Sequence, residues 1–111
     1  MRFSTDLANK AEGSHEVAIS RARAGYQSRL VVQADEVAAL GSRAMEKVAL
    51  DELARWSHRL HGTAGSFGIS SVTDAAEQLS AALKAKRPVQ DIKEHAERLA
   101  SCMRNTLGTD Q

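Results

Sequence analysis

Hydrophobic residues recur along this chain at the spacing of helical turns. The first clear series is Leu30, Ala34, Val37, Leu40 and Ala44. The same spacing returns in two later stretches, at Val72, Ala75, Ala76, Leu79, Ala82 and Leu83 and again at Val89, Ile92, Ala96, Leu99, Met103 and Leu107. Steps of three and four residues place side chains on one face of an α-helix, whereas strands need alternation. Because alternation is absent, the pattern predicts an all-α protein.

Turn and capping signals divide the chain into four helices. The second is expected to begin near Val48 or Leu50 and to end at Gly68, a residue that easily adopts a left-handed conformation. A serine at 70 or 71 is expected to cap the third helix, and Pro88 to stand at or near the start of the fourth. Short connections between amphipathic helices predict an antiparallel up-down four-helix bundle.

The amino-terminal residues fit this pattern less well. Residues 1–13 are polar and weakly periodic, which predicts a flexible or frayed segment or a short accessory helix. The helical bundle is expected to span residues 14–111 as one domain, with a turn or kink near Gly41 and Ser42.

Composition excludes several classes of function. The 111 residues carry 15 basic and 14 acidic side chains, a balance that gives no electrostatic case for nucleic-acid binding. No apolar run approaches the ~20 residues that span a bilayer, so no membrane segment is expected. The single cysteine excludes an internal disulfide and fits a reducing compartment. These features predict a soluble, cytoplasmic protein.

The helix around residues 48–67 has one unusual face. At 100° per residue, Gly65 and Gly62 lie roughly 20° and 40° from His58, while Trp56 and Leu60 lie roughly 160° away. Glycine inside a helix costs roughly 0.5–1 kcal/mol relative to alanine, so two glycines on one face need a reason. We interpret them as access for a large partner to the exposed imidazole of His58.

Other interpretations of these residues are weaker. His58 and His61 could form half of a metal site, but no other cluster completes it, so no metal is expected. Trp56 and Phe67 fall at angles typical of core residues, and Cys102 is expected to pack as a small buried hydrophobe.

The stretch HRLHGTAGSFG, from His58 to Gly68, followed by ISSVTDAAEQL, resembles the signature of the histidine phosphotransfer (HPt) domain family. The positions that match are His58, Leu60, Gly62, Thr63, Ala64, Gly68, Val72 and Leu79. The resemblance implies a phosphocarrier in a multistep His–Asp phosphorelay, which accepts a phosphoryl group on His58 from one receiver-domain aspartate and passes it to another. It implies no catalysis by the chain alone, because the partner supplies most of the positioning and charge.

The resemblance also implies the surroundings of His58. Receiver domains of hybrid histidine kinases and of response regulators are the expected partners, and the chain is expected to be a monomer. No cofactor is expected on this chain, since the receiver carries Mg²⁺. Contact with the phosphoryl group or the receiver is expected from Arg55, Arg59, His61, Gly62 and Gly65.

Two positions depart from the family pattern. His61 stands where the family usually has lysine, and Ser80 where an acidic residue commonly follows Leu79. Histidine side chains are mostly neutral at pH 7, so the phosphoryl group is less strongly stabilised unless Arg55 and Arg59 share the role. The substitution at position 61 keeps open an alternative, in which the chain is a non-catalytic helical adaptor that docks receivers without phosphotransfer.

Overall fold

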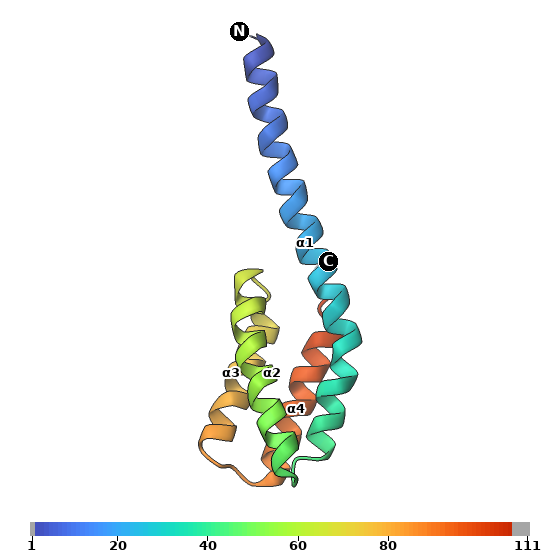
Figure 1. The fold of residues 1–111 in the computed structure, drawn as a ribbon, viewed down its shortest axis with the longest axis vertical. Coiled ribbons are helices and arrows are strands. Elements are labelled where there is room, and N and C mark those ends of the chain that lie inside the picture. Colours follow the sequence, from blue (N-terminus) through green and yellow to red (C-terminus); the bar gives the residue numbers. More distant parts are fainter. Residues whose placement is uncertain (1, 108–111) are drawn as a thin grey trace.

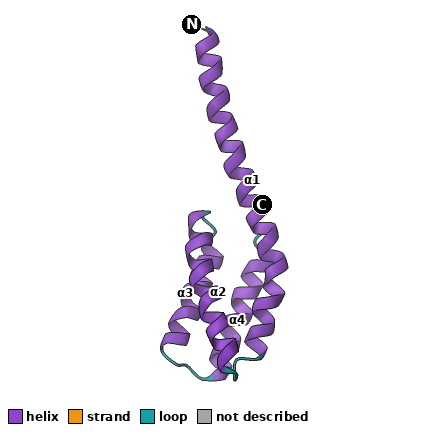
Figure 2. Ribbon diagram, in the orientation of Figure 1, coloured by secondary structure: helices purple, strands orange, loops and turns teal. Residues whose placement is uncertain are grey.

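The computed structural model describes residues 2–107, with side chains from Val17 onward. All regular elements of this part are helices, as Figure 2 shows, which confirms the predicted all-α class. The four helices are α1 (Arg2–Ser42), α2 (Lys47–Ser66), α3 (Ser70–Lys84) and α4 (Val89–Arg104). No helix in residues 2–107 combines the length and the apolar character needed to cross a membrane.

The helices alternate in direction, down, up, down and up along the bundle axis (Figure 1). Helix α1 packs chiefly against α4 and α2 chiefly against α3, and α3·α4 and α1·α2 contacts close the bundle. This is the predicted antiparallel four-helix bundle. The amino-terminal half of α1 continues past the other three helices, so the longest dimension of the molecule is 66 Å against 22 and 21 Å across.

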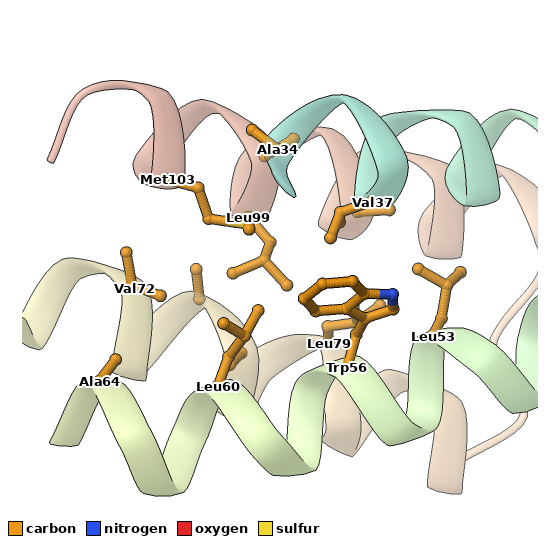
Figure 3. Close-up of a cluster of buried hydrophobic side chains, with 14 of the residues drawn as sticks. Ala34, Val37, Leu53, Trp56, Leu60, Ala64, Val72, Leu79, Leu99 and Met103 are labelled. Atoms are coloured by element: carbon orange, nitrogen blue, oxygen red, sulfur yellow. The ribbon is translucent and has the colours of Figure 1, made fainter. Parts of the chain in front are cut away.

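Each helix contributes one apolar stripe to the core. Trp56 projects from α2 into the space between the helices, close to Val37 of α1 and Leu53 of its own helix (Figure 3). Leu30, Leu53, Leu60, Leu79, Leu99 and Met103 are among the largest side chains that are fully buried. Burial of a leucine or methionine contributes roughly 1.5–3 kcal/mol, which makes these stripes the main source of stability. Trp56 and Phe67 therefore pack as predicted, Trp56 inside the core and Phe67 partly buried against it.

The first helix has no boundary at residue 14, where the bundle is predicted to begin. Helix α1 is continuous across this position, and it ends at Ser42, close to the predicted turn. Among the described side chains, Tyr26 is the first that is buried, while Val17 and Ile19 are exposed. The bundle core is therefore built from residue 26 onward, and the flexibility expected for residues 1–13 stays a prediction.

The turn between α2 and α3 follows the prediction at one end and departs from it at the other. Gly68 has a φ of +72°, its N–H donates to the Gly65 carbonyl, and the N–H of Ile69 donates to Ala64. This is a Schellman motif, which ends α2 as expected. The predicted serine caps are wrong, because α3 begins at Ser70 itself and Ile69 occupies the N-cap position without a side-chain cap. Ile69 is held there by burial in the core.

Gly41 marks the closest approach of α1 to α4. A Cβ built on Gly41 would lie 2.7 Å from the Cβ of Ala96, well inside van der Waals contact. Each Cβ is bonded directly to the backbone, so no side-chain rotation relieves the overlap. The glycine therefore permits the close packing of these two helices.

Gly41→Ala is expected to lower the free energy of unfolding. Overpacking costs roughly 1–3 kcal/mol, against a gain in helix propensity of at most about 1 kcal/mol near a helix end. Urea denaturation followed by circular dichroism measures the change. A midpoint equal to or above that of the wild type would show that α1 and α4 do not pack at this distance.

Candidate functional site

Helix α2 divides cleanly into a buried face and an exposed face. Its buried residues are Ala49, Leu53, Trp56, Ser57, Leu60 and Ala64. His58 and His61 are exposed, as are Gly62 and Gly65. Burial of the apolar stripe thus fixes the rotation of α2 and turns both imidazoles outward, as the helical angles predict.

The glycines beside His58 are not required by packing within the chain. A Cβ on Gly62 would meet nothing within 4 Å, and a Cβ on Gly65 would meet only Thr73 of α3, at an ordinary 3.9 Å. This contrasts with Gly41, where a Cβ has no space. The bare backbone at positions 62 and 65 leaves the surface beside the imidazoles open to a molecule that approaches from outside.

The two histidines line one wall of an open groove of about 340 Å³ between α2 and α3. Ser57 belongs to the same wall, and its hydroxyl is occupied by a hydrogen bond to the Ala54 carbonyl at 2.9 Å. The opposite wall carries Glu77, Ser80 and Lys84 of α3. The groove therefore brings imidazole, hydroxyl, carboxylate and ammonium groups together at the surface.

Arg55 and Arg59 do not line this groove, and both have other partners. The guanidinium of Arg55 donates to the Glu52 carboxylate at 3.0 Å, in a pair that is largely exposed. The guanidinium carbon of Arg59 lies 4.6 Å from the centre of the Trp56 ring, at cation–π distance. Exposed ion pairs contribute about 0–1 kcal/mol, so an approaching anion could recruit Arg55 at little cost.

Contacts with α1 hold the carboxyl end of α2 in place. The rings of Tyr26 and Phe67 are stacked, with centroids 5.0 Å apart, and Arg23 donates from Nε to the Phe67 carbonyl at 3.0 Å. Burial raises the pKa of the Tyr26 hydroxyl, although the charges of Arg29 and Arg59 act in the opposite direction. These contacts fix the turn that follows Gly65 and thereby the end of the exposed face.

Metal-binding and thiol chemistry receive no support from the described residues. Within residues 17–107, no group of three or more His, Cys, Asp or Glu side chains is placed to hold a metal ion. Cys102 is partly buried against the core, and this burial raises the pKa of its thiol, which disfavours the reactive thiolate.

Sequence reasoning found the α2 wall of the groove and missed the α3 wall. Lys84 stands in the basic segment that ends α3, Ser80 was notable only as a departure from a pattern, and Glu77 had no assigned role. The signal that could have found them is their spacing. Residues 77, 80 and 84 lie on one helical face, next to the apolar stripe that packs against α2.

Comparison with known proteins gives one family. The family model described as the Hpt domain matches residues 27–108, which cover most of the chain. No curated protein and no solved structure matches. The match begins within one residue of Tyr26, where burial in the bundle begins.

Gly62→Ala is expected to raise the free energy of unfolding by about 0.5–1 kcal/mol. The new methyl group meets open space, so only the gain in helix propensity remains. The same urea experiment measures it, with Gly41→Ala as the matched substitution of opposite sign. Destabilisation by Gly62→Ala would mean that the glycine serves the fold.

Proposed function

Because the chain belongs to the Hpt domain family, we propose that it carries a phosphoryl group on His58 between the aspartates of two receiver domains. Hpt domains perform histidine phosphotransfer in phosphorelays and interact with receiver domains. They are phosphocarriers rather than enzymes in their own right.

One observation supports His58 above all others. Its imidazole is exposed on the face of α2 opposite the core, beside a glycine whose missing side chain serves no contact within the chain. Of the four histidines, His15 lies outside the described side chains, and His95 on α4 is partly buried with an Nδ1 that has no hydrogen-bond partner. His61 lines the same groove, but it stands at the position where the family usually has lysine.

The chemistry needs little from this chain. The unprotonated nitrogen of a neutral imidazole attacks the phosphorus of the receiver's aspartyl phosphate. A P–N bond forms and the P–O bond breaks, so that aspartate leaves as a carboxylate and the second ring nitrogen keeps its proton. The receiver brings the Mg²⁺ that neutralises charge on the transferred group. This chain presents the imidazole on the exposed face of a helix and leaves room around it.

The proposed partners are receiver domains of hybrid histidine kinases and of response regulators, and the chain acts as a monomer. A receiver would approach along the exposed face of α2, over Gly62 and Gly65. Arg55 and Arg59, at the edge of this face, would meet the acidic rim of the receiver. Both guanidiniums are exposed enough to exchange their present partners.

Replacement of His58 by glutamine is expected to abolish transfer. The protein is mixed with a receiver that carries labelled aspartyl phosphate, and label stable to alkali but labile to acid is measured on this chain. His61→Gln serves as the matched control, since it changes the same residue type on the same face, and it should retain label. Label that persists in His58→Gln and disappears in His61→Gln would move the site to position 61.

The same assay separates phosphotransfer from a purely structural partnership. An adaptor that only docks receivers would bind a receiver and take up no label from it. Uptake on His58 excludes this alternative, and binding without uptake from a panel of receivers would establish it.

A larger residue at position 62 is expected to block the receiver without unfolding the helix. Gly62→Met should slow transfer from a phosphorylated receiver by at least about tenfold, because the side chain occupies the path of approach. Phosphorylation by a small donor, phosphoramidate, should fall far less. Ala39→Met, an exposed change on α1, controls for added bulk. Equal loss with both donors would assign the glycine to the chemistry at His58 rather than to docking.

A further inference from the structure

A phosphoryl group on His58 would need positive charge close to it in the groove. A phosphoryl group on histidine carries close to two negative charges, and position 61 carries a histidine in place of a side chain with a permanent positive charge. Arg55 and Arg59 lie outside the groove and already face Glu52 and Trp56. The lining of the groove contains one side chain with a permanent positive charge, Lys84.

The register of the two helices places Lys84 within reach of His58. Gly65 faces Thr73 across the α2–α3 contact. Because the helices are antiparallel, one turn back along α2 corresponds to one turn forward along α3. Counting seven residues from the contact of Gly65 with Thr73, His58 lies level with Ser80. Lys84 lies four residues further along α3, about 6 Å away in the axial direction.

The direction in which helical side chains point shortens the axial separation between His58 and Lys84. Side chains tilt toward the amino terminus of their own helix. In an antiparallel pair, the side chain of His58 therefore tilts toward the level of Lys84, and the side chain of Lys84 tilts toward the level of His58. A four-carbon stem spans roughly one helical turn, so the ammonium group reaches the region next to the imidazole.

The acidic residue of the groove is oriented the other way. Glu77 lies level with His61, one turn beyond His58, and tilts toward the start of α3 and away from His58. Within the described part of the chain, Lys84 forms no ion pair that would hold it elsewhere. Its ammonium group is therefore available to a new anion in the groove.

We propose that Lys84 of α3 contacts the phosphoryl group on His58 and supplies the fixed positive charge that position 61 lacks. This inference rests on the proposed role of His58. The phosphoryl group enters by the step given above, in which the P–N bond forms as the P–O bond of the donor breaks. Lys84 takes no proton and forms no bond in that step. It stabilises the product by charge and by hydrogen bonds to phosphoryl oxygens.

The test uses the full chain and phosphoramidate as the donor, so no cognate receiver is needed. After phosphorylation, the ³¹P chemical shift is followed against pH to locate the titration of the phosphoryl group. A nearby ammonium favours the dianion, so Lys84→Met should move this titration upward, on the order of half a pH unit. Lys84→Arg should restore the wild-type midpoint, since it keeps the charge at the same place.

Lys47→Met is the matched control, because it removes the same charge from an exposed site on α2. Lys47 lies about 16 Å from His58 along the helix axis. The control should leave the titration unchanged.

A second measurement uses transfer from a phosphorylated receiver. The equilibrium constant for transfer to Lys84→Met should shift about threefold toward the phosphorylated receiver, whereas that for Lys84→Arg should stay near the wild-type value.

Each outcome decides the matter. A midpoint for Lys84→Met that equals the wild type, or a shift that Lys47→Met reproduces, overturns the role of Lys84 while leaving His58 as the carrier. If His58→Gln accepts the phosphoryl group as well as the wild type does, the proposed function fails first and the role of Lys84 fails with it. Circular dichroism confirms that the helical content of each variant is unchanged.

Discussion

The burial of one face of α2 determines how the rest of the candidate site is presented. Leu53, Trp56 and Leu60 fill the space between the helices, and any rotation of α2 would expose them to water. At about 25 cal/mol per Å² of apolar surface, a rotation of α2 that exposed these three side chains would cost several kcal/mol. The opposite face is therefore held outward by hydrophobic packing, with no polar contact needed to orient either imidazole.

Two glycines in helices of the same bundle serve opposite purposes. Gly41 lies where α1 and α4 approach so closely that a methyl group has no space, and it belongs to the fold. Gly62 lies where a methyl group would meet nothing, and the fold gains nothing from its absence. The distinction separates a glycine that other parts of the chain require from one that only an external partner explains.

The sequence was sufficient for the number and order of the helices and for one wall of the groove. Apolar spacing predicted the four helices, and Gly68 marked the end of α2, because both signals are local. The N-cap at Ile69 was missed, since a buried apolar residue there is favoured by tertiary packing and has no local capping signature. Spacing along α3 places Glu77, Ser80 and Lys84 on one face, but it does not show what that face meets. The position of Lys84 one turn from the level of His58 depends on the register between two helices, which no signal within one helix reveals.

The groove has walls on two sides only, and both of its histidines are open to water. A protein can bind to this surface and dissociate from it without displacement of any helix of the bundle. Exchange at such a surface is governed by how often molecules collide in a suitable orientation and by how long they stay together. The bundle therefore needs no conformational change of its own, and the rate of exchange at the groove depends on the proteins that bind there.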